Sequence, residues 1–159
     1  MGTNFYVRIN VKSRDKEKVY SYFKYLSEHE HWAHKRYDGK YIDIHIGKRS
    51  AGWRFLFCAN ENFLYPLTKE GISEFIQRNG GGHIRDEYGR SFTTDQFWNE
   101  EISTTSGWDI ESYYRNNPQE KRYHYNSNDF SSWTKEFKPN EYGEFYSDGL
   151  RFTVSTYFS

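Results

Sequence analysis

The sequence has little of several features that stabilise or anchor proteins of other classes. It contains a single cysteine, Cys58, so an intramolecular disulfide is excluded, and we interpret this residue as a buried thiol at the end of an apolar run. No apolar run approaches the roughly 20 residues that a membrane span requires, and the amino terminus lacks a signal-peptide pattern. We therefore expect a soluble protein of a reducing cytoplasm, with no membrane partner.

The chain also lacks an excess of charge of either sign. Lys and Arg number 22, as do Asp and Glu. Residues 1–58 carry 12 Lys and Arg against 6 Asp and Glu, whereas residues 59–159 carry 10 against 16. A neutral total argues against general nucleic-acid binding and equally against a polyanionic mimic of DNA. A local anion site stays open.

Aliphatic residues are scarce and aromatic residues are abundant. The chain holds 4 Val, 9 Ile and 5 Leu, against 13 Phe, 15 Tyr and 5 Trp. Because disordered chains are poor in aromatic residues, this composition indicates a globular protein whose core is built from rings. The length of 159 residues favours one domain.

Hydrophobic periodicity divides the first third of the chain into a strand, a helix and a hairpin. Residues 4–12 alternate between apolar and polar, which predicts a strand. Apolar residues at helical spacing behind a serine predict a helix over about 14–29. Two further strand-like runs predict a hairpin over 40–58, whose loop is the hexapeptide GKRSAG at 47–52.

The remainder of the chain carries local start and stop signals. Thr68 can cap a helix that Asn79 and the following glycines end. A short hairpin is expected around residues 86–89, followed by a helix that Thr94 caps. The Asp-Gly dipeptide at 148–149 is a strong hairpin signal.

Together these elements predict an α+β fold in a single domain over residues 1–159. We expect a mainly antiparallel sheet with two or three helices and an aromatic-rich core. The first and last strands are expected to be neighbours in the sheet. Residues 103–140 are interpreted as long ordered loops held by aromatic anchors, with partial disorder as the alternative.

The segment HIGKRSAGW at 45–53 is the first candidate site. Its cations, glycines and backbone amides could hold a phosphate group, and its tryptophan could stack on a base. The ligand-binding residues would be Lys48, Arg49, Ser50 and Trp53. The alternative is a solvated hairpin loop, because exposed cationic turns are common. The glycine spacing of a P-loop is absent.

A histidine cluster is the second candidate site. The segment HEHWAH places three histidines close together, and a fourth lies on a nearby predicted strand. They are His29, His31, His34 and His45. Histidines bind zinc well, and four ligands would close a structural site. The alternative is adventitious binding by a surface cluster, and no HExxH motif supports catalytic zinc.

The residues suited to nucleophilic catalysis are few. Cys58 and His83 could meet, but a buried thiol at a strand end is usually inert. No GxSxG motif occurs, and no pair of carboxylates stands out from ordinary surface charge. We therefore expect a protein that is not an enzyme.

The aromatic segment 103–140 is the third candidate site. Tyr, Trp, Ser and Asn in loops provide rigid contact area and adaptable hydrogen bonds, which is typical of a recognition surface. The alternative is that these rings form the core of an aliphatic-poor protein. The expected partner-binding residues are Trp108, Tyr113, Tyr114, Tyr123, Tyr125 and Trp133.

Four motifs of the sequence are distinctive when they are taken together. They are GTNFYVRIN at the start, HIGKRSAGW, DEYG at 86–89 and the terminal YFS. The set is similar to small uncharacterised proteins of phages and prophages that begin GTNYY, carry HIGKSSAGW before an aromatic strand, and end near FS. Many of these have a Cys-x-x-Cys shortly before the HIGK histidine, which implies a small metal site, whereas this chain has HEHWAH. The resemblance implies a phage origin and no established activity.

Three functions follow as expectations. The first is a non-enzymatic binding protein of phage type that acts on a host protein in the bacterial cytoplasm, as an inhibitor of a defence system. The second is a protein that sequesters a nucleotide or another phosphorylated small molecule through HIGKRSAGW. The third is a metal-dependent enzyme, with zinc as the possible cofactor.

Overall fold

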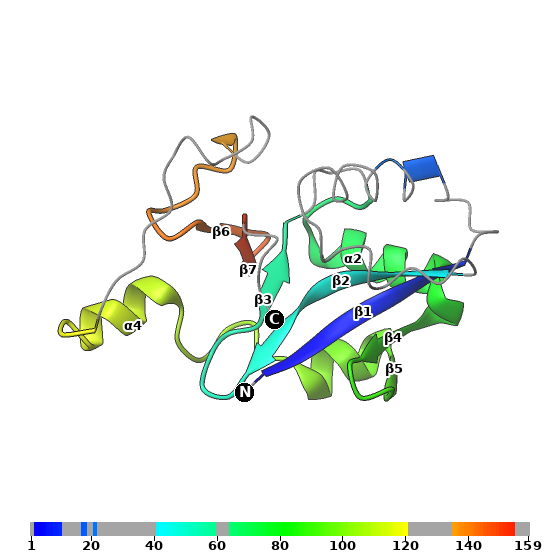
Figure 1. Cartoon of the computed structure of the whole chain (residues 1–159), viewed down its shortest axis with the longest axis horizontal. Helices are drawn as coiled ribbons and strands as arrows, with labels where there is room; N and C mark the ends of the chain where they lie inside the picture. The colour runs from blue at the N-terminus through cyan, green and yellow to red at the C-terminus, as the bar shows by residue number, and fades with distance from the viewer. Residues whose placement is uncertain are drawn as a thin grey trace.

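The computed structural model describes residues 2–10, 17–18, 21, 41–59, 64–120 and 135–154 (Figure 1). The helix expected over 14–29 lies outside these residues except at positions 17, 18 and 21, which are helical. Within the described ranges, no helix is both long and apolar enough to span a lipid bilayer.

The described strands form one seven-stranded sheet in the order β5-β4-β1-β2-β3-β7-β6. The strands are β1 (Gly2–Asn10), β2 (Tyr41–Ser50), β3 (Leu56–Cys58), β4 (His83–Asp86), β5 (Ser91–Thr93), β6 (Glu144–Ser147) and β7 (Leu150–Thr153). Every neighbouring pair is antiparallel except β3 and β7, which run parallel. The predicted α+β fold with a mainly antiparallel sheet is confirmed.

The expectation that the first and last strands are neighbours is wrong for β1 and β7. β1 lies between β4 and β2, so both of its edges are occupied. β7 pairs on one side with β6, through the tight hairpin at Asp148 and Gly149, and on the other side with β3. Asp148 and Gly149 both have positive φ, at 53° and 73°, as a two-residue hairpin turn requires.

Helix α2 (Lys69–Arg78) covers one face of the sheet. The Thr68 side chain caps it as predicted, because its Oγ1 accepts a hydrogen bond from the Gly71 amide at 2.9 Å. The buried face of the helix carries Ile72, Phe75 and Ile76. A 3₁₀ turn, η2 (Gly80–Gly82), follows Asn79, the C-cap residue.

The cap of the next helix is Thr93, one residue before Thr94, the cap residue that the sequence suggested. Thr93 ends β5 in an extended conformation and forms a capping box with Gln96. Thr94 is the first residue of α3 (Thr94–Gln96), which continues as a π-helical turn, η3 (Phe97–Glu101). Farther along, α4 (Ile110–Asn116) is capped by Asp109 in the same reciprocal way.

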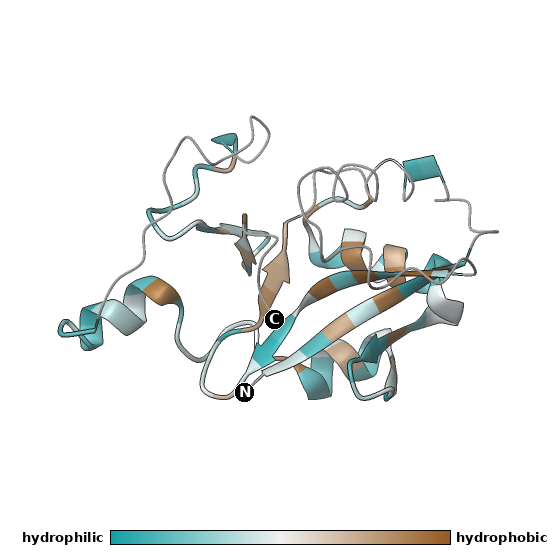
Figure 2. Cartoon of the chain, viewed as in Figure 1, coloured by the Kyte–Doolittle hydropathy of each residue, from teal (hydrophilic) through white to brown (hydrophobic). Residues whose placement is uncertain are grey.

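One row of paired positions crosses the sheet and carries the centre of the core. Phe5 pairs with Gly47, Gly47 with Phe57, Phe57 with Phe152, and Phe152 with Phe145. Because directly paired residues share a face, the row consists of four phenylalanines and one glycine on the face that α2 covers. Figure 2 shows the matching alternation of apolar and polar residues along β1 and β2.

Gly47 is the gap in this row, and the ring of Phe55 fills it. The centroid of that ring lies 5.7 Å from Phe5 and 4.6 Å from Phe57. A Cβ atom at Gly47 would collide with the Phe55 ring and lie 2.5 Å from the carbonyl oxygen of Leu56. The close approach of ring and strand therefore requires glycine.

We predict that Gly47→Ala destabilises the fold by about 1–3 kcal/mol, because the added methyl overpacks a core without space for it. Urea unfolding measures the change. The same substitution in a Phe55→Leu background should cost less, since the smaller side chain leaves room. An equal cost in both backgrounds would contradict the assignment of Phe55 to the gap.

Candidate partner-binding site

The segment HIGKRSAGW extends β2 farther than the sequence suggested. The stretch 47–50, expected in a hairpin loop, continues as strand and stays paired with β1 as far as Gly2. The turn that follows is short, closed by a hydrogen bond from the Trp53 amide to the Ser50 carbonyl at 3.0 Å, with Gly52 at φ 83°. Pairing with β1 on one side and β3 on the other holds this stretch extended.

A β-bulge in β2 decides where the two cations of the motif point. Tyr6 pairs with His45 but Phe5 pairs with Gly47, so Ile46 is an extra residue in β2. Beyond the bulge, Lys48 pairs with Asn4 and lies on the face opposite Phe5. The next residue, Arg49, returns to the face of Phe5.

Contacts of the two side chains agree with this placement. The guanidinium of Arg49 lies 5.7 Å from the Phe5 ring and donates to the Glu101 carboxylate at 2.5 Å and to its carbonyl at 3.2 Å. Lys48 extends over Gly2 on the other face, where a Cβ on Gly2 would collide with its side chain and lie 2.9 Å from Oγ of Ser50. The structure therefore does not bring Lys48 and Arg49 together, and Arg49 fastens η3 to β2.

Three of the four motifs that carry the resemblance meet at the start of β1. Gly2 pairs with Ser50 of HIGKRSAGW, and Phe5 pairs with Asp86 of DEYG. The Asn4 amide donates to the Glu87 carboxylate at 2.9 Å, and the Glu87 amide donates to the Asn4 carbonyl at 3.0 Å. In this chain the residues of these motifs therefore hold β1, β2 and the turn after β4 together.

The proposed metal ligands fall mostly outside the described residues, which include none of His29, His31 and His34. His45 lies on β2, stacks on Tyr6 at 5.1 Å between centroids, and has its Nε2 3.1 Å from the Gly47 carbonyl. Among the residues that the structure describes, no group of three or more His, Cys, Asp or Glu side chains could hold a metal ion.

Cys58 and His83 are not placed side by side. Cys58 lies on β3 and His83 on β4, with β2 and β1 between them. Cys58 is buried, and burial raises the pKa of its thiol well above the usual value. A raised pKa disfavours the reactive thiolate, which agrees with the interpretation of Cys58 as an inert core residue.

The turn after β2 binds the start of the aromatic segment. The Trp108 amide donates to the Gly52 carbonyl at 2.9 Å, and the Arg54 amide donates to the Trp108 carbonyl at 3.0 Å. Gly107, at φ 102°, approaches this turn so closely that a Cβ would lie 2.9 Å from the Gly52 oxygen. The rings of Trp53 and Tyr113 pack at 5.0 Å between centroids.

A buried ion pair lies beneath this contact. Arg151 donates to Oε2 of Glu144 from Nε at 3.1 Å and from Nη2 at 2.5 Å. Both side chains are about 95% buried, with exposed fractions of 5% and 3%. Nη1 of Arg151 donates to the carbonyl of Arg54 at 2.8 Å, and the guanidinium lies 5.3 Å from the centre of the Trp53 ring. The pair thus supports the turn from below.

A network of hydrogen bonds among Arg54, Asp109 and Tyr146, which we call the rim, joins the aromatic segment to β6. The Tyr146 hydroxyl donates to the Asp109 carboxylate at 2.6 Å and accepts from Nη1 of Arg54 at 3.2 Å. Nε of Arg54 donates to the carbonyl of Gly107 at 3.2 Å. Residues from the turn, the α4 cap and β6 are therefore held in one network.

This network raises the pKa of Tyr146 and lowers the pKa of Asp109. Partial burial raises the pKa of Tyr146 to about 12, together with the hydrogen bond it donates to Asp109 and the charge of that carboxylate. Burial of Asp109 acts to raise its pKa as well. That effect is outweighed by hydrogen bonds from Tyr146 and Ser112 and by the charge of Arg54, so the pKa falls to about 2.

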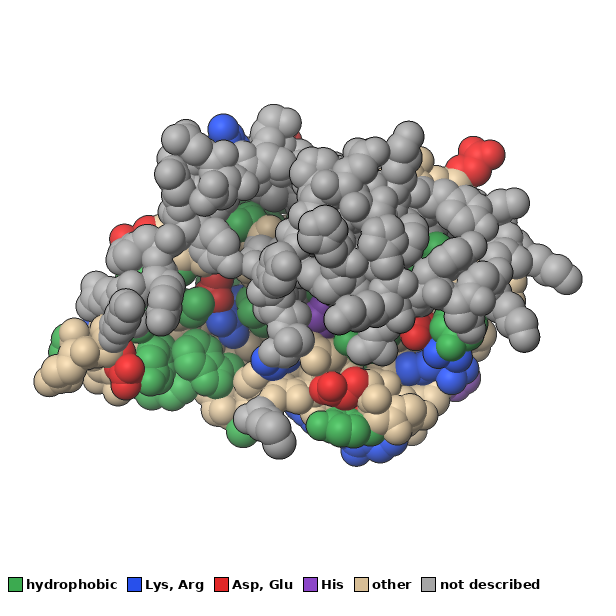
Figure 3. Space-filling view, viewed as in Figure 1, with side chains coloured by type: hydrophobic (Ala, Val, Ile, Leu, Met, Phe, Trp, Pro, Cys, Tyr) green, Lys and Arg blue, Asp and Glu red, His purple; other side chains and the backbone are tan. Residues whose placement is uncertain are grey.

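We define the Trp108 surface as Trp53, Arg54, Trp108 and Tyr146. Trp108 is 38% exposed and Tyr146 45%, and both belong to the large hydrophobic residues that the described part of the chain exposes. Figure 3 shows hydrophobic side chains gathered beside α4 on this side of the molecule. Of the expected partner-binding residues, Tyr113 and Tyr114 are half-buried. Tyr123, Tyr125 and Trp133 lie outside the described residues.

The sequence interpretation missed Arg54 and Tyr146. Alternation places Tyr146 opposite buried Phe145 on β6, and this is the one signal that could have found it. Nothing near Arg54 in the sequence indicates its hydrogen bonds, because both partners are more than 50 residues away.

Comparisons of this chain with models of protein families, with curated proteins and with solved structures found no match. The resemblance to phage proteins therefore stays a prediction from the sequence motifs.

We predict that Glu144→Ala destabilises the fold by about 3–5 kcal/mol, because it leaves the Arg151 guanidinium buried without its partner. Urea unfolding measures the loss. The double variant Glu144→Leu with Arg151→Met should be closer to the wild type than the single variant, since neither charge remains. A double variant less stable than Glu144→Ala would contradict the assignment.

The hydrogen bonds of the rim predict how the stability of the fold depends on pH. The pKa of Tyr146 is raised in the folded state, so the stability it contributes is complete below pH 10 and is lost as pH rises toward 12. Asp109→Asn keeps a cap residue but removes the charge, so the pKa of Tyr146 should fall toward 10.

Tyrosinate absorbance during alkaline titration measures this pKa. Subtracting the curve of Tyr146→Phe from that of the wild type isolates one hydroxyl, and the same subtraction is made in the Asp109→Asn background. An unchanged pKa would show that Asp109 does not act on Tyr146.

Proposed function

We propose that this chain is a non-enzymatic binding protein that recognises a host protein through the Trp108 surface, and that it inhibits a bacterial defence system. The observation that carries the proposal is an exposed tryptophan held in a fixed position beside an exposed tyrosine and an arginine. Trp, Tyr and Arg are the residue types most enriched at the energetic centres of protein interfaces.

Rigidity is the second support for a binding role. Trp108 is fixed by two backbone hydrogen bonds to the turn and by an edge-to-face contact with Tyr113 at 6.2 Å between centroids. Arg54 donates a hydrogen bond to the Tyr146 hydroxyl, which in turn donates to Asp109. Because these side chains are ordered before a partner arrives, binding loses less conformational entropy.

The biological setting rests on the motif resemblance, which implies a phage or prophage origin and hence a host factor as target. The non-enzymatic character is supported by the raised pKa of Cys58 and by its separation from His83.

The geometry gives less support to a phosphate binder. Such a site would need Lys48 and Arg49 to converge, whereas they lie on opposite faces of the sheet and Arg49 pairs with Glu101. Trp53, the proposed stacking residue, already contacts Tyr113 and the Arg151 guanidinium.

The test is affinity capture from a bacterial lysate followed by titration of the captured protein against purified chain. We expect Trp108→Ala to weaken binding by roughly 30-fold or more, as removal of a central interface tryptophan does. The matched control is Tyr88→Ala, because Tyr88 is 65% exposed but lies in the β4–β5 turn. It should bind as the wild type does.

Two outcomes would contradict the proposal. One is binding that Tyr88→Ala weakens and Trp108→Ala leaves intact, which would move the interface to the β4–β5 turn. The other is a lysate from which neither the wild-type chain nor the control captures any protein. Where a protein is captured, inhibition is measured separately, as the loss of that protein's activity when the chain is added.

A further inference from the structure

Three aromatic side chains in and beside the Trp108 surface have polar atoms without an intramolecular partner. Among the described residues, no hydrogen bond engages Nε1 of Trp53, Nε1 of Trp108 or the hydroxyl of Tyr113. The atoms of the half-buried Trp53 and Tyr113 are not sealed from solvent, and Trp108 is exposed. By contrast, Nε1 of Trp98 donates to Oγ of Ser73 at 2.8 Å. An indole N–H can only donate, so the surface offers free donors.

The hydrogen-bond acceptors next to these rings are already engaged. The Gly52 carbonyl accepts from the Trp108 amide, and the carbonyls of Gly107 and Trp108 both accept from Arg54. The Asp109 carboxylate accepts from the backbone of α4 and from the hydroxyl of the rim. A partner that covers this surface therefore meets free donors and engaged acceptors.

The rings form a fixed and uncharged contact area. The planes of the Trp108 and Tyr113 rings meet at 85°, so the two residues present ring surfaces at about a right angle. Trp53 packs on Tyr113 at 5.0 Å between centroids. The two charged residues beside them, Arg54 and Asp109, have opposite signs and are both hydrogen-bonded to the rim hydroxyl. The surface therefore has no excess of charge that would select a charged ligand.

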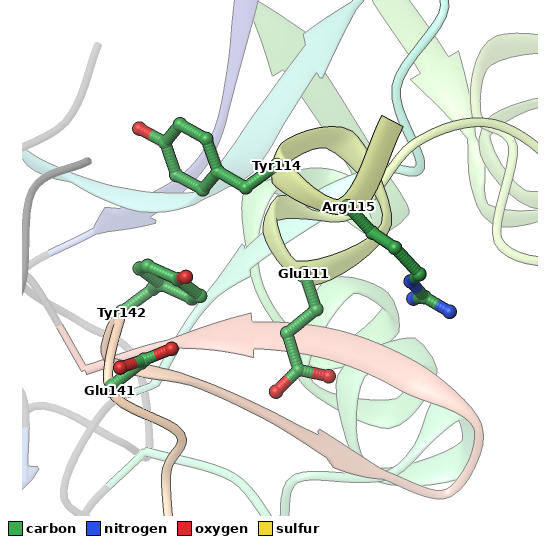
Figure 4. A pocket seen from close by; sticks show the side chains of 5 residues that line it. All are labelled: Glu111, Tyr114, Arg115, Glu141 and Tyr142. Carbon is green, nitrogen blue, oxygen red and sulfur yellow. The ribbon is translucent and has the colours of Figure 1, made fainter. Parts of the chain in front are cut away.

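The row of rings ends at a charged pocket, which marks the limit of this uncharged surface. Tyr113 contacts Tyr114 at 5.7 Å between centroids. Tyr114 and Tyr142 line an open pocket of about 480 Å³ (Figure 4). The other lining residues are charged, namely Glu111, Arg115 and Glu141.

We propose that the Trp108 surface, together with Tyr113, binds a proline-rich segment of the partner protein in the polyproline II conformation. The inference rests on the proposed function and names the kind of segment that is recognised at the same site. Such a segment has no internal hydrogen bonds, so its carbonyls are free to accept, and its prolines have no N–H that needs an acceptor. Surfaces lined by aromatic side chains bind these segments in other proteins.

Other backbone conformations match the surface less well. A helix keeps most of its carbonyls in its own hydrogen bonds, so it leaves the indole N–H groups of Trp53 and Trp108 unpaired. A strand brings N–H groups for which the neighbouring acceptors are already engaged. Because a donor that is buried without a partner is costly, the proline-rich segment is the best match to this surface.

The test uses the full chain and acetyl-hexaproline amide as the probe, with acetyl-(Gly-Ser)₃ amide as an uncharged control peptide of the same length. We expect the proline probe at millimolar concentration to give saturable shifts of the indole N–H signals of Trp53 and Trp108 in ¹⁵N–¹H spectra. The Trp98 signal should stay in place, because that N–H already donates to Ser73. No saturable shift at Trp108, or equal shifts with both peptides, would overturn the proposal.

Variants separate hydrogen bonding from ring contact. Trp108→Phe keeps an apolar ring but removes the N–H, so hexaproline binding, followed at the Trp53 signal, should weaken by about three- to tenfold. Trp108→Ala removes the ring as well and should weaken binding further. An unchanged Trp98 indole signal shows that each variant keeps the fold.

The matched control is Tyr88→Phe, which removes an exposed hydroxyl from the β4–β5 turn. It should bind hexaproline as the wild type does. Equal weakening by Tyr88→Phe and Trp108→Phe, or wild-type affinity in Trp108→Phe, would contradict the assignment of the indole N–H as a donor to the segment.

The probe needs no partner, so the two proposals fail separately. A chain that binds hexaproline but captures no host protein overturns the proposed function and leaves the preference for proline. A chain that captures a protein through Trp108 but shows no saturable shift with hexaproline overturns that preference and leaves the proposed function.

Discussion

The buried pair of Arg151 and Glu144 supports the half of the molecule that we associate with binding. Its guanidinium holds the carbonyl of Arg54 and lies against the Trp53 ring, and the turn above it holds Trp108. A buried ion pair is weak evidence for stability in itself, because desolvation offsets much of the attraction. The pair matters here because it fixes positions. The Arg151 guanidinium stays beside Glu144 and so holds the turn after β2 in place, and this turn holds the exposed Trp108.

The most distinctive motif of the sequence, HIGKRSAGW, has a structural role. Ile46 is the extra residue of a bulge, Gly47 makes room for the Phe55 ring, and Gly52 allows the turn. Lys48 and Arg49 point to opposite faces because they are adjacent in a strand, and the bulge decides which face each of them takes. A pattern of cations and glycines that is typical of anion sites therefore serves here to join β1, β2 and the aromatic segment.

Local sequence signals predicted much of the fold, whereas the contacts between distant segments were missed. The cap at Thr68 and the hairpin at 148–149 depend on neighbouring residues, so the sequence showed them. The bulge was hidden because Ile46 continues the apolar alternation of Ile42 and Ile44. The parallel pairing of β3 with β7 joins segments about 95 residues apart and leaves no periodic trace. For the candidate site, Trp108 was predicted from composition, whereas Arg54 and Tyr146 required the fold.

Hydrogen exchange of the chain, alone and bound to its captured protein, tests the location of the interface most directly. The account predicts slower exchange over residues 106–115 and 141–147, in and beside the Trp108 surface, and no change over 86–90 in the β4–β5 turn. Slower exchange confined to residues 86–90, or to 47–50, would contradict it and place recognition on the junction of the sequence motifs instead.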